Sequence, residues 1–111
     1  MTTILPTDEN NSPIPALRLR DGGAQKITVT ASSARNAVAF DAGTRIITLY
    51  ASVAMYVRQG GAGVVATTSD HYLPAGMSCD IAIGGEEAAF SSFIAALRVD
   101  TDGILYISER N

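Results

Sequence analysis

The only histidine of the chain, His71, lies close in sequence to several groups that could act with it in catalysis. Ser69 or Cys79 would be the nucleophile, and Asp70 or Asp80 would orient the imidazole ring. Nucleophilic catalysis needs these groups in one hydrogen-bonded chain, because a serine or cysteine must be activated by a base. A single histidine at a loop edge is more often a surface or structural residue. We therefore assign no catalytic residue and expect the protein not to be an enzyme.

The sequence Asp100-x-Asp102-Gly103 begins like a calcium-binding loop but does not continue as one. Such a loop needs a further Asp or Asn and a Glu at its twelfth position, and Leu105 and Asn111 supply neither. A turn explains these residues better. One cysteine and one histidine cannot form a zinc site of the usual spacing. We expect no metal and no cofactor.

Two further patterns do not match a known chemistry. The glycine-rich stretch 60–63 is followed by Val64 and Val65 rather than by the lysine of a phosphate-binding loop. Glu86 and Glu87 are adjacent, so on a strand their side chains would point to opposite faces and could not act as a carboxylate pair.

The composition limits the classes of partner. Among the 111 residues, charged residues make up 17% and the net charge is -3, with a single lysine, Lys26, so no basic surface for nucleic acid is expected. No apolar run is long enough to span a membrane, and the start, MTTILPTDENN, lacks the regions of a secretory signal. We expect partners that are neither nucleic acid nor membrane, since a surface with few charges is often covered by other protein subunits.

The segment Thr44–Arg58 is the clearest element that would position side chains. Its alternation with period two predicts a strand whose buried face carries the apolar set Ile47, Leu49, Ala51, Val53, Met55 and Val57. The opposite face, with Tyr50 and Tyr56, would be either the second half of a core or a surface that meets another subunit. A hinge at Ala51-Ser52 would let this long strand serve two sheets.

Short alternating stretches separated by Gly, Asp and Pro turns fill the rest of the chain. Asp21-Gly22-Gly23 predicts a hairpin turn between the first two stretches, and Asp100–Gly103 predicts another before the last. Residues 86–97 also have helical spacing, but a strand over 90–99 fits the following turn better. The expected strands besides 44–58 are Ala16–Arg20, Gln25–Ala31, Asn36–Phe40, Val64–Thr67, His71–Leu73, Met77–Ile83, 90–99 and Ile104–Glu109.

These elements predict one all-β domain, a β-sandwich or jelly-roll-like barrel of about eight to ten short strands. Residues 16–111 would form the sandwich, and residues 1–15, which are polar and interrupted by prolines, would form an extended N-terminal arm. The body of the chain has few Lys or Pro residues to protect strand edges, which favours association between copies. The candidate partner-binding residues are Ile4, Pro6, Pro13, Ile14, Tyr50, Tyr56 and Tyr72.

Several stretches resemble small β-rich structural proteins of tailed bacteriophages and prophages. The resemblance runs from about residue 27 to residue 109, and it rests on short motifs: ITVTASSAR at 27–35, GTRII at 43–47, AMYVRQG at 54–60, YLPAG at 72–76 and GILYISE at 103–109. It implies a non-enzymatic virion component, with no catalytic residues to carry over. The segment after Gly85, with Glu86-Glu87, matches no motif of this kind.

The function expected from the resemblance is that of a capsid decoration or cement protein, made in the host bacterial cytoplasm and located in the virion. Its partners would be other copies of itself, with a trimer among the candidate homo-oligomers, and the major capsid protein or other virion subunits. A neck, tail or baseplate component is the first alternative. A glycan- or receptor-binding β-sandwich is the second, with loops 60–70 and 72–76 as its site because binding residues favour loops on a rigid scaffold.

Overall fold

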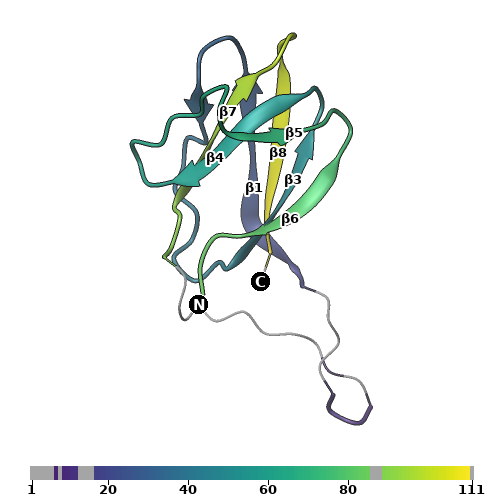
Figure 1. Ribbon diagram of the computed structural model, residues 1–111. Helices are drawn as coiled ribbons and strands as arrows, with labels where there is room; N and C mark the ends of the chain where they lie inside the picture. Colours follow the sequence, from purple (N-terminus) through teal and green to yellow (C-terminus); the bar gives the residue numbers. More distant parts are fainter. Residues whose placement is uncertain (1–6, 8, 13–16, 86–88, 111) are drawn as a thin grey trace.

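The computed structural model describes residues 7, 9–12, 17–85 and 89–110. Eight strands form two four-stranded antiparallel sheets, and no helix occurs in these ranges (Figure 1). One sheet has the order β1-β8-β3-β6 and the other the order β2-β7-β4-β5. The strands are β1 (Leu19–Val29), β2 (Ala34–Arg35), β3 (Ile46–Ala51), β4 (Met55–Gly60), β5 (His71–Leu73), β6 (Ser78–Ala82), β7 (Phe93–Arg98) and β8 (Gly103–Arg110).

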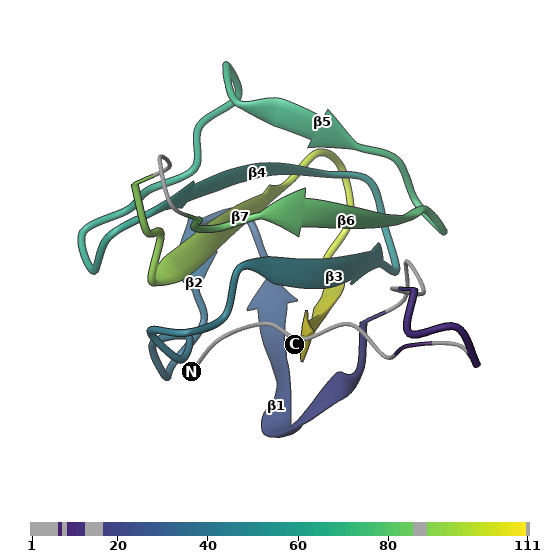
Figure 2. The ribbon, with the colours of Figure 1, turned by 90° about the horizontal axis from the view of Figure 1, so that it is seen from below.

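The strand order is that of a jelly roll. β1 pairs with β8, β2 with β7, β3 with β6 and β4 with β5, so the chain is a long hairpin rolled into two layers (Figure 2). Successive strands change sheet, except β4 and β5, which pair with each other. The prediction of an all-β sandwich or jelly-roll-like barrel of about eight to ten short strands is confirmed, with eight strands in the described residues.

The core lies between the two sheets and follows the alternation of the sequence. In β3, Ile47, Leu49 and Ala51 point inward, and Thr48 and Tyr50 point outward. The inner faces of both sheets contribute to one apolar cluster. Its buried members are Ile27, Val29, Phe40, Ile47, Leu49, Ala51, Met55, Leu73, Ile83, Ile94, Ala96, Leu105 and Ile107.

The segment Thr44–Arg58 contributes one strand to each sheet, as the hinge prediction required. The segment divides into β3 in one sheet and β4 in the other, with a bend at residues 52–54 rather than at Ala51-Ser52 alone. Met55 is buried, and Val53 and Val57 are partly buried against the core. The predicted apolar face is therefore confirmed.

The hairpin predicted at Asp21-Gly22-Gly23 is wrong. β1 continues through these residues as one strand of 11 residues, and its register with β8 shifts between Leu19 and Ala24. Gly22 has a φ of +73°, which suits glycine in a β-bulge as well as in a turn. Both uses need a positive φ, so the turn residues could not distinguish a bulge from a hairpin.

The strands predicted at Asn36–Phe40 and Val64–Thr67 are also wrong, because side chains take the backbone hydrogen bonds that a neighbouring strand would need. Gln25 accepts from the Val38 N–H through Oε1 at 3.3 Å and donates to the Val38 carbonyl through Nε2 at 2.9 Å. The Ala66 N–H donates to Ser33 Oγ at 2.8 Å.

The last turn has a different role from the one predicted. Residues 99–101 bend as expected, but they carry the chain from β7 in one sheet to β8 in the other, so β7 and β8 are not a paired hairpin. Within the described part of 86–97, β7 confirms the strand interpretation over the helical one. Glu86 and Glu87 lie outside the described residues.

Candidate functional site

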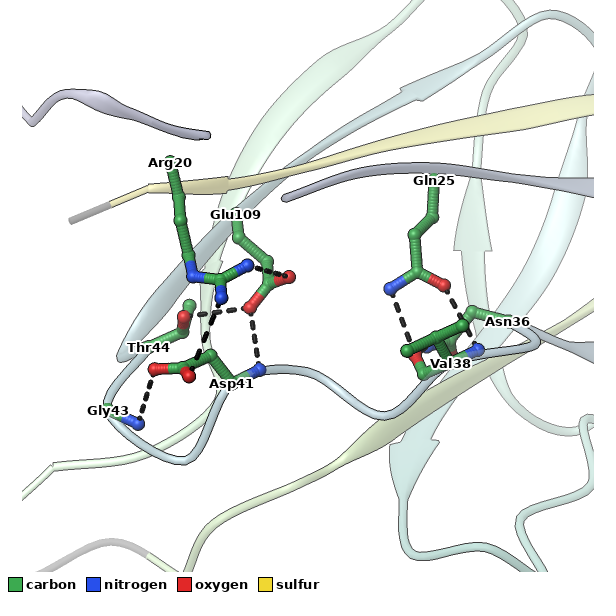
Figure 3. Close-up of polar contacts among 8 residues, drawn as sticks. All are labelled: Arg20, Gln25, Asn36, Val38, Asp41, Gly43, Thr44 and Glu109. Carbon is green, nitrogen blue, oxygen red and sulfur yellow. Dashed lines mark hydrogen bonds and ion pairs between the residues drawn. The ribbon is translucent and has the colours of Figure 1, made fainter. Parts of the chain in front are cut away.

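A buried polar cluster lies at the end of the sandwich where β1 and β8 meet the 36–45 segment (Figure 3). Glu109 is only 2% exposed although it is charged. Its Oε1 accepts from the Asp41 N–H and from Thr44 Oγ1, both at 2.8 Å, and its Oε2 lies 3.4 Å from Arg20 Nη1. Arg20 Nη2 also lies 3.6 Å from Asp41 Oδ1. Each carboxylate oxygen of Glu109 therefore has a donor within the fold.

Asn36 forms a second buried contact beside this cluster. Its Oδ1 accepts from the Ile94 N–H at 2.9 Å, and its Nδ2 donates to the Val38 carbonyl at 2.6 Å. The side chain is fully buried, and Figure 3 shows it next to Gln25 and Val38. These bonds add to the backbone bonds from the Asn36 N–H to the Ile94 carbonyl and from the Phe40 N–H to the Ser92 carbonyl. Both polar contacts thus fix the 36–45 segment to the sheets.

The groups around His71 do not form a catalytic chain. Asp70 and His71 line a groove of about 520 Å³ at the open side of the sandwich, with Val57, Arg58, Gln59, Ile81 and Ile94. Asp70 Oδ2 accepts from the Thr67 N–H and hydroxyl, and its Oδ1 lies 4.0 Å from Arg58 Nη1. Among the described residues, no hydrogen bond links His71 to Asp70, Asp80, Ser69 or Cys79.

Cys79 lies on β6 opposite Leu49, partly buried against the core. Burial, and to a smaller extent the charge of Asp80, raise the pKa of the Cys79 thiol. A raised pKa keeps the thiol protonated at neutral pH, which opposes a nucleophilic role. Asp80 itself accepts from Thr48 Oγ1 at 2.6 Å on the outer face of the sheet.

Tyr50 lies on the outer face of the β1-β8-β3-β6 sheet, next to Tyr106 on β8. The two ring centroids are 6.2 Å apart with planes tilted by 45°, and each side chain is 44% exposed. The strand registers place Lys26 on one side of the pair and Ser78 on the other, in one row across four strands. We call this row, Lys26-Tyr106-Tyr50-Ser78, the tyrosine row.

Tyr56 and Tyr72 form a second pair on the outer face of the other sheet, with centroids 6.1 Å apart. The predicted tyrosines are therefore divided between opposite faces of the molecule and do not make one surface. The second pair shares its face with Arg35, whose guanidinium stacks 4.0 Å from the centre of the Phe93 ring. The other predicted binding residues, Ile4, Pro6, Pro13 and Ile14, lie outside the described residues.

Sequence reasoning missed Tyr106 and Glu109 as residues of interest. Tyr106 could have been found, because the alternation of β8 places it outward between the buried Leu105 and Ile107. Glu109 could not, because the same alternation puts a charged residue on the inner face without showing that Asp41, Thr44 and Arg20 would meet it there.

No group of three or more His, Cys, Asp or Glu residues in the described ranges is arranged to hold a metal ion. The same ranges contain no helix long and apolar enough to cross a membrane. No protein-family model matches the chain, and no curated protein or solved structure matches it significantly. The tyrosine row is a partly exposed aromatic surface of the kind that can bind another protein.

Proposed function

We propose that this protein is a non-enzymatic structural subunit of a tailed bacteriophage virion, most specifically a capsid decoration protein that self-associates and binds major capsid subunits. The sequence resemblance suggests the class. The jelly roll is compatible with it, since viral capsid domains use this architecture, as do lectins and other proteins. Because one fold serves many functions, the proposal depends on the surface of the molecule rather than on its topology.

The single observation that carries the proposal is the outer face of the β1-β8-β3-β6 sheet. In the strand registers, the charged residues placed on this face are Lys26, Asp80 and Arg110. Two of them are already engaged: Thr48 Oγ1 donates to Asp80 and accepts from Arg110 Nη1 at 3.0 Å, and Arg110 Nη2 donates to the Leu17 carbonyl at 2.9 Å. The exposed Tyr50 and Tyr106 rings thus lie on a face with little free charge, which suits a protein interface.

The opposite outer face is less suited to docking. It carries Arg35 and Arg58, and the loop after β4 turns back over it, since the Ala66 N–H reaches Ser33 beside β2. Ala95, which the register places between these two arginines, is fully buried without a partner chain. This face is therefore partly covered by its own loop, and we assign capsid binding to the tyrosine row.

The test is binding to phage heads that lack the protein, measured by co-sedimentation. Full-length protein should pellet with the heads, and the double variant Tyr50→Ser/Tyr106→Ser should lose most of this binding, because truncating central aromatic residues removes the main contacts of an interface. The matched control, Tyr56→Ser/Tyr72→Ser, removes an aromatic pair from the opposite face and should bind like the unmodified protein. Failure of the unmodified protein to bind heads, or equal loss in both variants, would contradict the proposal.

A further inference from the structure

The open side of the sandwich leaves part of the core uncovered. The groove of about 520 Å³ described above lies where the edge strands β5 and β6 of the two sheets face each other. Val57, Ile81 and Ile94 form its apolar lining, and they come from both sheets. Val57 and Ile81 are only partly buried, so apolar surface remains exposed at the level of the core.

The free edge of β6 offers backbone hydrogen bonds along this groove. The Ile83 N–H donates to the Arg45 carbonyl at 2.7 Å and the Ala51 N–H donates to the Met77 carbonyl at 3.2 Å. Because hydrogen-bonded pairs alternate in an antiparallel ladder, the N–H and C=O groups of residues 78, 80 and 82 point away from β3. Gln59 Nε2 donates to the Ala82 carbonyl at 3.1 Å. The backbone N–H and C=O groups of Ser78 and Asp80 therefore remain for a partner strand.

The other sheet edges are poor acceptors for a strand. β1 is interrupted by the bulge between Leu19 and Ala24, and β2 and β5 have only two and three residues. Bulges and short strands are common protections against edge pairing. β6 has five residues, an unbroken register with β3 and neither proline nor lysine, and its one charged side chain, Asp80, is bonded to Thr48 on the outer face. An extended peptide that joins this molecule would therefore join it at β6.

The N-terminal segment of this chain has the composition of such a peptide. Residues 2–5, Thr-Thr-Ile-Leu, favour an extended strand and end before Pro6. In Figure 1 residues 9–12 lie well away from both sheets. Leu17, where the described chain resumes, is bonded to Arg110 on β8, and the β1 edge that follows lies across the sheet from β6. The N-terminal segment therefore joins the body of the molecule at the sheet edge that lies farthest from its own β6.

We propose that residues 2–5 of one copy add to β6 of a second copy as an antiparallel or parallel strand. The strand would pair with the backbone of Ser78 and Asp80, and Ile4 or Leu5 would cover the exposed parts of Val57 and Ile81. Backbone pairing gives such strand addition its affinity, and the side chain in the groove gives it specificity. The inference rests on the proposed self-association and names the contact that produces it.

Disulfide cross-linking tests both the contact and the identity of the donor. In a Cys79→Ala background, chains carrying Ile4→Cys are mixed under oxidising conditions with chains carrying His71→Cys, whose side chain lines the groove. We expect a disulfide-linked dimer, and none when Thr101→Cys, an exposed turn position, replaces His71→Cys. If a single chain with both substitutions forms only an internal disulfide, the arm occupies its own groove and the proposal is wrong. Equal cross-linking to both positions would also overturn it.

Sedimentation of a variant that lacks residues 2–5 provides the second measurement. The variant should lose self-association but keep the circular dichroism spectrum and melting behaviour of the full chain, because the eight strands and the core cluster described above are formed by residues 19–110. A variant that still self-associates like the full chain would contradict the strand addition. Binding to heads through the tyrosine row is measured separately, so heads that bind this variant while cross-linking fails would reject the arm contact alone.

Discussion

The Glu109 carboxylate is buried at one end of the sandwich. An exposed position would avoid the free-energy cost of removing this group from water. Its oxygens accept from Thr44, from the backbone of Asp41 and from the Arg20 guanidinium. Arg20 and Asp41 are separated from Glu109 by most of the chain, so the cluster ties the first strand, the 36–45 segment and the last strand together. A buried charge is tolerated only where such partners satisfy it, and the removal of one partner leaves the others unpaired.

The replacement Glu109→Ala should therefore destabilise the protein by about 3 kcal/mol, because it leaves the Asp41 N–H and the Thr44 hydroxyl without an acceptor in a buried place. Urea unfolding followed by circular dichroism measures the change. The control is Asp102→Ala, which removes an exposed carboxylate paired with Arg98 four residues earlier and should cost less than about 1 kcal/mol. Similar effects of the two substitutions would show that the cluster contributes nothing beyond an ordinary surface ion pair.

At the scale of elements, the bend at residues 52–54 packs against the start of β8. The Ser52 N–H donates to the Ile104 carbonyl at 3.0 Å, and the Ile104 N–H donates to Ser52 Oγ at 2.8 Å. A Cβ atom at Gly103 would clash with Val53 and lie 2.8 Å from Ser52 Oγ. Glycine at this position lets the chain cross from one sheet to the other directly over β8.

We expect Gly103→Ala to lower the free energy of unfolding by about 1 to 3 kcal/mol, the usual cost of forcing extra atoms into a packed site. The matched control is Gly61→Ala, where a Cβ would meet no atom within 4 Å. Thermal and urea melts of both variants measure the difference. If Gly103→Ala is as stable as the control, the close approach of the bend to β8 does not constrain the fold.

Sequence alternation predicted the strands that face the core, but it predicted their connections poorly. Ile47, Leu49 and Met55 were correctly assigned to the buried face because period two depends only on local geometry. Asp21–Gly23 and Asp100–Gly103 were misassigned as hairpin turns because glycine and aspartate suit bulges and sheet-to-sheet bends equally well. Asn36–Phe40 failed for another reason: its end residues donate to the Ile94 and Ser92 carbonyls, but Val38 between them is bonded by the side chains of Gln25 and Asn36, which no local pattern indicates.

The candidate surface was predicted less completely than the fold. Tyr50, Tyr56 and Tyr72 were all candidate partner-binding residues, but only knowledge of the sheet order shows that the first lies on a different face from the other two. The pairing of Tyr50 with Tyr106 depends on β3 and β8 being neighbours, which are far apart in the chain. Contacts between distant strands are set by topology, and a period-two pattern carries no information about it.

At the scale of the whole molecule, the two proposed contacts meet at Ser78, where the tyrosine row ends and the free edge of β6 begins. The tyrosine row lies on the outer face of the β1-β8-β3-β6 sheet, and the groove lies at the side where β6 ends that sheet. Because the tyrosine row uses the outer face of the sheet and strand addition uses the backbone edge of β6, we propose that one copy can bind a capsid surface and a neighbouring copy at the same time. This arrangement is what a repeated structural component requires, since each copy must meet two kinds of partner.

The most direct test of the proposed virion role is the amount of this protein in phage particles purified from cells that carry its gene. Quantitative mass spectrometry of particles purified by density gradient gives the ratio of the chain to the major capsid protein. A decoration subunit should be present at a fixed ratio that is the same in every preparation and survives repeated banding. Absence of the chain from purified particles, with all of it recovered in the soluble host fraction, would contradict the assignment to the virion.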